Sequence, residues 1–371
     1  MRRVSVLIVQ RILPPYRLAF FRELCASPQM DVCVAYGTNA GASALRSVQN
    51  PSGVKTERLR NIFPVKGDKL VIQRGLLSLL RSGDFDVVIA EFNLRIVTNV
   101  VACIAAKLLG RKFVWWGHGV SPTSGGGSLR LRLLLARFAD AMIFYDEGGA
   151  KRFIALGVPQ QKVFVATNSI DTEEIAPLVE QRPLAKRHRI LYVGRLLPGK
   201  KVELLIRAFA RALPRLRHDV ELTIIGSGPE QKRLAQVVEQ LDLLKHVCFV
   251  PALYEQVKLA PYFNSAYVSV SPGFIGLGAI HSLAYGVPVL VARDEPHRPE
   301  VNALEENIDA IFFNSDDVEN LTLNLVSLAD DSSRHERMSC AGFDKIHNGF
   351  GVKPMVNAFE RAVAHAQGNQ T

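Results

Sequence analysis

The sequence predicts an α/β protein made of two doubly wound domains, each with a parallel sheet between layers of helices. Two observations predict this class. Short and nearly uninterrupted apolar runs alternate with amphipathic segments of helical period along both halves of the chain, and such buried strands between helices are typical of parallel sheets. The chain has 371 residues, which is more than one hydrophobic core ordinarily accommodates, so two domains are expected.

The first half of the chain, residues 1–170, alternates strands with helices. The expected strands are Val4–Val9, Asp31–Tyr36, Asp86–Ala90, Lys112–Trp116, Ala141–Tyr145 and Val163–Ala166. The expected helices are Arg17–Ala26, Lys69–Leu80, Ile96–Leu109, Ser128–Ala139 and Gly148–Leu156. Residues 37–68 show no clear hydrophobic period, and we expect a long, partly mobile loop there.

Acidic residues, prolines and a basic cluster interrupt this alternation over Thr172–Arg189, which is the best linker candidate. We therefore expect an N-terminal domain over residues 1–170 and a C-terminal domain over residues 171–349. The strands of the second array are Ile190–Val193, Glu221–Ile225, Val247–Val250, Tyr267–Ser271, Val287–Val291 and Ala310–Phe313. Its helices include Lys201–Leu213, Glu230–Leu241, Gly276–Tyr285, Arg334–Ile346 and Val352–Ala366.

The net charge of +10 is unevenly distributed between the two halves. Residues 1–170 contain 23 Lys and Arg against 10 Asp and Glu, a net charge of +13, whereas the remainder contains 22 against 25, a net charge of −3. This asymmetry indicates an anionic partner for the first half, although a merely soluble basic surface is the alternative. No nucleic-acid motif accompanies the basic residues, so an anionic membrane surface is favoured and nucleic acid is not expected.

Cysteine spacing and hydropathy indicate the compartment. The five cysteines lie far apart, which predicts neither a zinc site nor a disulfide framework and favours a reducing compartment. No apolar run approaches the length of a membrane-spanning helix, and the apolar run after Arg3 is short enough to be the first strand rather than a signal peptide. We expect a cytoplasmic protein that is peripheral on the inner face of the membrane.

Three loops that follow strands of the second half carry residues suited to an anion. They are Arg195 and Lys200 after the first strand, Gly226 and Gly228 after the second, and Gly273, Gly276 and Leu277 after the fourth. Carboxyl ends of parallel strands meet at one edge of a sheet, where such folds bind ligands. Cationic side chains and a glycine-rich turn before a helix favour a diphosphate, whereas ordinary surface charge is the alternative for Arg195 and Lys200. Gln231 stands where a dinucleotide fingerprint requires glycine, which disfavours an NAD site.

Strand ends of the first half supply a second set of candidates. His118, between Gly117 and Gly119, ends a strand and is positioned to donate a hydrogen bond to a ligand; the alternative is a histidine packed in a loop. Other polar residues near strand ends are candidates for contacting the acceptor of a transferred group. They are Arg11 and Tyr16 after the first strand, and Glu91 and Asn93 after the third.

Two further patterns allow more than one interpretation. The segment Asp84-Phe85-Asp86 imitates an aspartate pair that binds a divalent ion, but it enters a strand at the end away from the expected site. We interpret it as a turn and expect neither a metal nor a cofactor. Arginines at 130, 132 and 137 lie among leucines, as in a helix on a membrane surface or in a core helix with snorkelling arginines; the core interpretation is favoured.

Taken in order, these motifs resemble those of glycosyltransferases with the GT-B fold, specifically the retaining enzymes of family 4. The resemblance covers nearly the whole chain, and the order of the motifs is more specific than any one of them. The similar segments are Gly117-His118-Gly119, Lys162–Asp171, Gly194-Arg195 with Lys200, Gly226-Ser-Gly228-Pro, and Gly276-Leu277 followed by Gly286-Val-Pro-Val289.

The resemblance implies a nucleotide sugar bound by the C-terminal domain and a glycan acceptor bound by the N-terminal domain, on either side of a cleft. Arg195 and Lys200 would hold the diphosphate together with the backbone of Gly276 and Leu277, and His118 would lie beside the donor sugar. A final helix, about residues 350–371, would cross back to the N-terminal domain. The implied activity is metal-independent sugar transfer, with retention, to a lipid-linked acceptor in surface polysaccharide or lipopolysaccharide biosynthesis.

The chain departs from the family pattern at two places. The usual pair of glutamates falls on Gly273 and His281; the histidine can hydrogen-bond a ribose, but the glycine cannot replace a carboxylate. The glycine pair after the first strand is replaced by Leu13–Tyr16. We favour a subgroup with altered donor contacts over a catalytically silent module that binds a partner transferase or a glycan. A two-domain epimerase would need acid and base residues that we do not identify, and the nucleotide base, sugar and linkage stay open.

Overall fold

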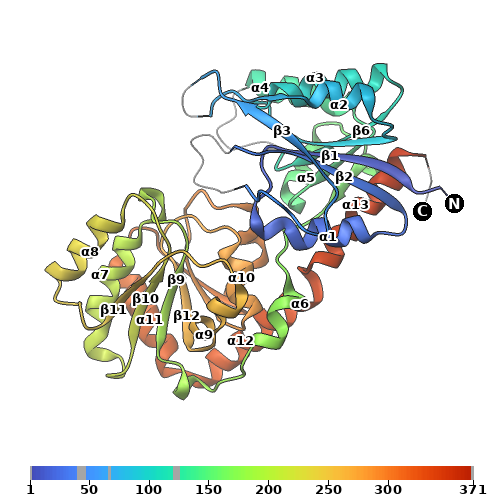
Figure 1. Cartoon of the computed structure of the whole chain (residues 1–371). Coiled ribbons are helices and arrows are strands. Elements are labelled where there is room, and N and C mark those ends of the chain that lie inside the picture. Colours follow the sequence, from blue (N-terminus) through green and yellow to red (C-terminus); the bar gives the residue numbers. More distant parts are fainter. Residues whose placement is uncertain (1, 40–46, 66–67, 120–125, 369–371) are drawn as a thin grey trace. The chain divides into compact units, whose positions relative to one another are not determined.

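The computed structural model describes residues 2–39, 47–65, 68–119 and 126–368 (Figure 1). The chain forms two compact units of α/β architecture: unit 1 contains Met1–Ser169 and Val352–Thr371, and unit 2 contains Ile170–Gly351. The first boundary lies one residue from the expected position. The last segment of the chain belongs to the same unit as the first.

Unit 1 is built on an eight-stranded sheet with the order β4-β3-β2-β1-β5-β6-β7-β8. Its strands are β1 Val4–Gln10, β2 Met30–Gly37, β3 Thr56–Ile62, β4 Ile72–Arg74, β5 Val87–Glu91, β6 Lys112–Gly117, β7 Ala141–Phe144 and β8 Val163–Val165. All neighbours pair in parallel except β3 and β4. The carboxyl ends of β1, β5, β6 and β7 therefore share one edge.

Helices cover both faces of this sheet. They are α1 Leu18–Ala26, α2 Leu76–Ser82, α3 Val97–Leu108, α4 Gly126–Phe138, α5 Glu147–Ala155 and α13 Val352–Ala366. Helices α1 and α13 contribute to one hydrophobic cluster, and α2 to α5 contribute to the other. The Phe359 ring of α13 lies 4.9 Å from Phe20 and 4.8 Å from Trp116 between ring centroids. The last helix thus completes the core that the first helix begins.

Two expectations for unit 1 are wrong. Residues 56–62 form strand β3 instead of a loop; only Leu59 and Asn61 of this strand are buried, so its hydrophobic alternation is weak. The helix expected over Lys69–Leu80 is divided into β4 and α2 by Gly75, whose φ of 100° no helix interior adopts. Residues 40–46 and 66–67 of the expected loop lie outside the described residues.

Unit 2 is built on a six-stranded parallel sheet with the order β11-β10-β9-β12-β13-β14. Its strands are β9 Arg189–Val193, β10 Glu221–Ile225, β11 Val247–Val250, β12 Ala266–Ser271, β13 Val289–Ala292 and β14 Ala310–Phe313. Its helices are α6 Thr172–Ile175, α7 Val202–Ala212, α8 Gln231–Gln240, α9 Gln256–Asn264, α10 Gly278–Ala284, α11 Val318–Asp330 and α12 Ser332–Gly349. The order reverses beside β9, between β10 and β12, which is where doubly wound sheets bind ligands.

Three segments of unit 2 differ from the sequence interpretation. The expected linker contains α6, which is capped by the Asp171 side chain and anchored by the buried Ile175. Helix α9 was not predicted because Pro261 lies inside it and proline ordinarily ends a helix. Helix α11 was overlooked although its signals are ordinary: an Asp317 cap and a buried stripe that includes Leu325.

Within the part of the chain that the structure describes, no helix combines the length and the apolar character needed to cross a membrane.

Candidate active site

Three loops of unit 2 meet at the carboxyl edge of its sheet, with backbone packed against backbone. At three glycines, a Cβ atom would overlap a carbonyl oxygen of the neighbouring loop. The pairs are Gly226 with Gly194, Gly228 with Leu196 and Gly273 with Gly199, at 1.8, 2.2 and 2.2 Å. Any larger residue would push the loops apart, so glycine is required at these positions. The loops selected from the sequence therefore come together in the structure.

Lys200 is the cation at the centre of these loops. Its ammonium donates a 2.6 Å hydrogen bond to the carbonyl oxygen of Phe274 and lies 3.7 Å from the centroid of that ring. Burial, together with the charges of Arg195 and Arg298, lowers the pKa of Lys200 to about 8 against the opposing effect of Glu300. An ammonium in this surrounding favours an anion, because a negative charge would offset both its desolvation and the two guanidinium groups.

Two residues after β13 hold the glycine-rich turn. His297 Nδ1 accepts a 3.1 Å hydrogen bond from the Ile275 amide, and the Arg298 amide donates a 2.8 Å hydrogen bond to the Ile275 carbonyl. His297 Nε2 lies 2.8 Å from the carbonyl oxygen of Ala292 and is therefore its protonated nitrogen. Burial lowers the pKa of His297, consistent with a neutral ring that acts as a fixed acceptor for the turn.

The turn before α10 is flanked by the same segment. A Cβ atom at Gly276 would lie 3.4 Å from Cγ of Arg298 and 3.8 Å from a carboxylate oxygen of Glu300. Helix α10 begins at Gly278 rather than at Gly276, so Gly276 and Leu277 precede it. Arg298 and Glu300 therefore extend the set of charged groups beside this turn.

His281 lies within the helical layer. Its Nε2 is 2.8 Å from the side-chain oxygen of Gln256, and its ring lies 4.9 Å from Phe263 and 5.7 Å from Tyr285 between centroids. Burial lowers the pKa of His281 to about 4, so the ring is neutral at physiological pH. These contacts of His281 are to α9 and to Tyr285 at the end of α10, whereas those of Lys200 are to the glycine-rich turn.

A second polar cluster lies at the carboxyl edge of the unit 1 sheet. The guanidinium of Arg17 donates to Gln10 Oε1 at 2.6 Å and to the Tyr145 hydroxyl, and lies 4.5 Å from the centroid of Trp116. The His118 ring, exposed at the end of β6, lies 4.4 Å from the Tyr145 ring. Three strand ends and the start of α1 thus bring these groups together.

The expected acceptor-side residues have different surroundings. Glu91 Oε1 accepts a 2.9 Å hydrogen bond from the Arg11 amide, and the Arg11 side chain lies 3.5 Å from Asp68. The Asn93 amide donates to the Glu91 carbonyl at 2.8 Å. These three residues stabilise the loop ends of β1 and β5, whereas Tyr16 presents an exposed ring.

Asp84 and Asp86 lie where the turn interpretation places them, before β5. The Asp86 carboxylate accepts a 2.8 Å hydrogen bond from the Ser5 amide, and Arg2 lies 3.6 Å from both aspartates. Among the described residues, no group of three or more His, Cys, Asp or Glu could hold a metal ion. Metal independence stays a prediction.

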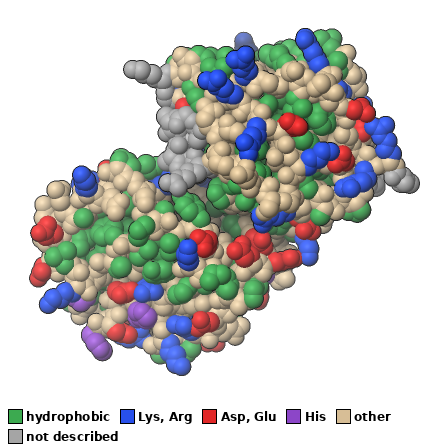
Figure 2. All heavy atoms as spheres, in the orientation of Figure 1, with side chains coloured by type: hydrophobic (Ala, Val, Ile, Leu, Met, Phe, Trp, Pro, Cys, Tyr) green, Lys and Arg blue, Asp and Glu red, His purple; other side chains and the backbone are tan. Residues whose placement is uncertain are grey.

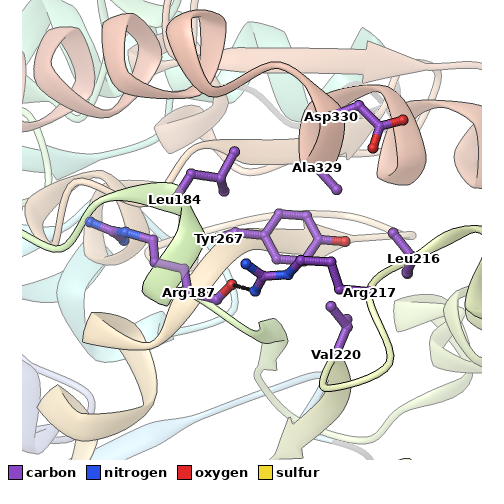
Figure 3. Close-up of a pocket in the computed structure, with 8 residues that line it drawn as sticks. All are labelled: Leu184, Arg187, Leu216, Arg217, Val220, Tyr267, Ala329 and Asp330. Carbon is purple, nitrogen blue, oxygen red and sulfur yellow. Dashed lines mark hydrogen bonds between the residues drawn. The ribbon is translucent and has the colours of Figure 1, made fainter.

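A small cavity in unit 2 lies at the opposite, amino edge of the sheet (Figure 3). Its volume is about 30 Å³, and the Tyr267 ring lies across it while Arg217 donates to the Arg187 carbonyl at 2.5 Å. The lining residues are Leu184, Arg187, Leu216, Arg217, Val220, Tyr267, Ala329 and Asp330. This volume suits one or two water molecules, so the cavity is too small for a nucleotide.

Sequence reasoning missed several charged and polar residues of both edges. They are Arg298, Glu300 and His297 in unit 2, and Gln10 and Tyr145 in unit 1. A signal was available for the first three, because the polar segment after Val289–Ala292 follows a buried strand like the loops that were selected.

Residues 174–345 match the family model described as glycosyl transferases group 1. The matched range lies within unit 2 and contains Lys200 and all three converging loops.

Two curated relatives share part of their sequence with the chain. The N-acetylgalactosamine-N,N'-diacetylbacillosaminyl-diphospho-undecaprenol 4-alpha-N-acetylgalactosaminyltransferase of Campylobacter jejuni is 31% identical over 161 residues, 42% of either chain. The GDP-mannose-dependent alpha-(1-6)-phosphatidylinositol monomannoside mannosyltransferase of Mycolicibacterium smegmatis is 27% identical over 224 residues, 55% of this chain and 56% of the relative. The chain thus spans about half the length of the curated relatives it matches.

Solved structures match the chain over nearly its whole length. The crystal structure of Anabaena HepE in complex with UDP has a TM-score of 0.72 and 16% sequence identity, and covers 97% of this chain and 99% of that one. A likeness at this identity establishes the fold, and the predicted GT-B fold class is confirmed.

Proposed function

Residues 174–345 belong to the glycosyl transferases group 1 family, and from this premise we propose that the chain transfers a sugar from a nucleoside diphosphate sugar to a hydroxyl group of a glycan acceptor. The observation that carries the proposal is the convergence of Lys200 and the glycine-rich turn at one sheet edge, with Lys200 bonded to Phe274 within that turn and the charge of Arg195 acting on it. The positive charges of these groups are complementary to the negative charge of a diphosphate. The UDP bound to HepE supports a nucleotide ligand.

The proposed reaction needs no protein nucleophile. The bond between the anomeric carbon and the diphosphate oxygen breaks, and the acceptor hydroxyl oxygen bonds to that carbon from the same face while its proton passes to the departing diphosphate. Negative charge grows on the leaving diphosphate, so preorganised cations beside it are expected to lower the barrier most. Lys200 and Arg195 have this role, together with the backbone of Gly276 and Leu277.

The acceptor is proposed to be lipid-linked, as part of surface polysaccharide or lipopolysaccharide biosynthesis. The names of the two relatives include a diphospho-undecaprenol and a phosphatidylinositol acceptor. His118 is the proposed contact of unit 1 to the sugar, and the exposed Tyr16 is its proposed contact to the acceptor. A lipid-linked acceptor favours a protein that acts at an anionic membrane surface, as does the net charge of +13 over residues 1–170.

A second candidate function is a catalytically silent module that binds a partner transferase or a glycan. The observation that favours it is at Gly273, where a Cβ atom would lie 2.2 Å from the Gly199 carbonyl oxygen. No carboxylate side chain fits at this position.

Nucleotide binding followed by turnover separates the two candidates. With UDP or GDP at about 100 times its Kd, a binder gains about 2.7 kcal/mol of stability, measured as a thermal shift. A shift with one nucleotide then directs a turnover assay with its sugars and a lipid-pyrophosphate saccharide. No shift with any nucleotide favours the silent module.

Replacement of the central cation tests the role of the site in turnover. Lys200→Met removes one charged hydrogen bond, of about 1.5–3 kcal/mol, and should lower turnover roughly ten- to 150-fold. Lys201→Asn is the control, because Lys201 bonds to Glu295 and Asp316 instead and asparagine tolerates its φ of 51°. Unchanged turnover in Lys200→Met would refute the assignment.

A further inference from the structure

Helix α3 exposes an apolar stripe. Val101, Ile104 and Leu108 lie three and four residues apart and so share one face of the helix. Leu108 is 84% exposed and Ile104 is 57% exposed. The opposite face, which includes Ala102 and Ala106, is buried against the sheet. An ordinary surface helix presents polar residues to solvent, so the outward face of α3 needs a different explanation.

Helix α4 exposes a stripe of the same kind. Leu131, Leu134 and Phe138 are exposed with the same spacing, at 49% for Leu134 and 58% for Phe138. Leu135 and Ala136 pack inward. The core interpretation of α4 therefore holds for one face, and the opposite face has the character of the membrane-surface alternative.

The two helices that carry the stripes are neighbours on one face of the unit 1 sheet. Helices α3 and α4 follow β5 and β6, which are neighbours in the sheet, and both contribute to the same hydrophobic cluster. Lys107 near the end of α3 forms a 2.5 Å ion pair with Asp140 after α4, and Arg132 of α4 donates to the Phe92 carbonyl before α3 at 3.0 Å. Hydrophobic and basic side chains adjoin over this part of the unit in the space-filling view (Figure 2).

We call these side chains the apolar ridge: Val101, Ile104, Leu108, Leu131, Leu134 and Phe138. The charged residues within the helices that carry the ridge, and within the neighbouring α2, have a single sign. Helices α2, α3 and α4 contain no Asp or Glu, and their basic residues are Arg81, Lys107, Arg130, Arg132 and Arg137. Arg130 and Arg137 are exposed on α4 beside the ridge. Apolar side chains next to cations match the acyl boundary and the phosphates of an anionic bilayer.

We propose that the apolar ridge, with Arg130 and Arg137, docks unit 1 on the surface of an anionic lipid membrane. The apolar side chains enter the acyl boundary while the two arginines contact lipid phosphates. A second copy of the chain fits less well, because two identical faces would bring arginines against arginines without a carboxylate on these helices. The inference deepens the membrane partner of the proposed function, yet it depends on unit 1 alone.

Vesicle co-sedimentation of the full chain tests the proposal. The chain should bind vesicles of phosphatidylglycerol and phosphatidylcholine at low salt, more weakly at high salt, and phosphatidylcholine vesicles weakly. Arg130→Gln with Arg137→Gln should lower partitioning about 30-fold, since each basic residue near an anionic surface contributes about fivefold. Ile104→Ser with Leu108→Ser and Leu134→Ser should lower it at least about tenfold, because apolar area no longer enters the bilayer.

Matched variants in unit 2 serve as controls. Leu244 and Val257 are each 67% exposed, so their replacement by serine removes exposed apolar area elsewhere on the chain. Lys232→Gln with Lys245→Gln removes two exposed charges. Both double variants should sediment with vesicles like the parent chain, and circular dichroism should show that every variant is folded.

Three outcomes would overturn the docking proposal. One is a parent chain that ignores anionic vesicles at low salt, and another is a ridge variant that binds them undiminished. The third is a ridge whose substitution changes self-association, measured by sedimentation velocity, in a chain that does not bind vesicles. A thermal shift with UDP or GDP tests the proposed function separately, and ridge variants should keep that shift. Vesicle binding without any thermal shift by a nucleotide would support the docking proposal and contradict the proposed reaction.

Discussion

At the scale of single residues, the decisive feature is the environment of one ammonium group. Lys200 is half-buried, bonded to a backbone carbonyl, and repelled by Arg195 and Arg298. These conditions make its positive charge costly until an anion is present. The same conditions predict how nucleotide binding depends on pH.

Nucleotide binding should be coupled to proton uptake by Lys200. Its pKa is about 8 in the free chain, below the ordinary 10.5, and a bound diphosphate raises it because the opposite charge favours the ammonium. Below pH 8 Lys200 is charged with or without a bound nucleotide, so its titration does not change the nucleotide affinity in that range. Above pH 8 binding takes up as much as one proton, and the Kd of UDP or GDP should rise by up to about tenfold per pH unit.

Calorimetric titration in buffers of different ionisation enthalpy measures this uptake directly. The uptake should vanish in Lys200→Met and persist in Lys201→Asn. The same shift of the pKa determines how Lys200 affects folding. Because the pKa is lower in the folded chain, the unfolded chain binds more protons than the folded chain between pH 8 and 10.5. The contribution of Lys200 to stability therefore rises with pH in that window. Equal proton uptake by the parent and Lys200→Met would contradict the assignment.

Gly273 should tolerate no side chain. An alanine Cβ would lie 2.2 Å from the Gly199 carbonyl oxygen and 3.0 Å from Cα of Lys200, so the two loops must separate. We expect Gly273→Ala to lower stability by about 1–3 kcal/mol and to weaken nucleotide binding through displacement of Lys200. Gly349→Ala, where nothing lies within 4 Å, is the control for denaturant unfolding and titration. Wild-type affinity in Gly273→Ala would show that the loop contact is dispensable.

At the scale of elements, the glycine-rich turn between β12 and α10 depends on the segment after β13. His297 supplies the acceptor for the Ile275 amide while Arg298 donates to the Ile275 carbonyl. The turn is therefore held by a histidine from a later segment of the chain. Substitution of His297 can loosen the turn without changing any charge next to a ligand.

Removal of this acceptor should loosen the turn. His297→Ala leaves the Ile275 amide without its partner, a loss of about 0.5–1.5 kcal/mol, and should weaken nucleotide binding about two- to tenfold. Hydrogen exchange followed by mass spectrometry should show faster exchange over residues 273–278. His297→Asn restores an acceptor and should recover part of both effects. Unchanged exchange in His297→Ala would mean that other contacts hold the turn.

Most strands and helices could be predicted because burial imposes a clear period on them. Strands such as Glu221–Ile225 and Ala141–Phe144 are apolar runs buried between helices, and α13 has the expected bounds. Strand β3 could not, because only two of its side chains face the core. Helix α9 could not either, because tertiary packing of Leu259 and Phe263 outweighs the local signal of a proline.

The candidate site could be predicted where residues follow strands in the sequence. Arg195, Lys200 and the glycines of the converging loops were selected by that rule. The partners that set the pKa of Lys200 could not be selected, because Arg298 and Glu300 come nearly a hundred residues later and approach only in the folded sheet. Likewise, the pairing of Arg17 with Tyr145 depends on two strand ends.

At the scale of the whole molecule, the two units differ in charge and in the number of chain segments from which each is built. The segment 1–170 carries the net positive charge, and unit 1 includes both ends of the chain. Unit 2 is a continuous segment with its own hydrophobic clusters. This arrangement predicts that each unit loses stability through its own core.

Two matched phenylalanine replacements should separate the units. Phe359 of α13 lies in the core of unit 1, and Phe209 of α7 in that of unit 2, both without exposed surface. Each replacement by alanine should cost about 3–5 kcal/mol through lost burial and a cavity.

In scanning calorimetry, bound UDP or GDP should raise only the unfolding transition of the unit that holds it. Phe209→Ala should lower that transition, whereas Phe359→Ala should lower the other and leave nucleotide affinity unchanged. A single transition that both variants shift equally would contradict independent cores, because loss of α13 would then destabilise the nucleotide site as well.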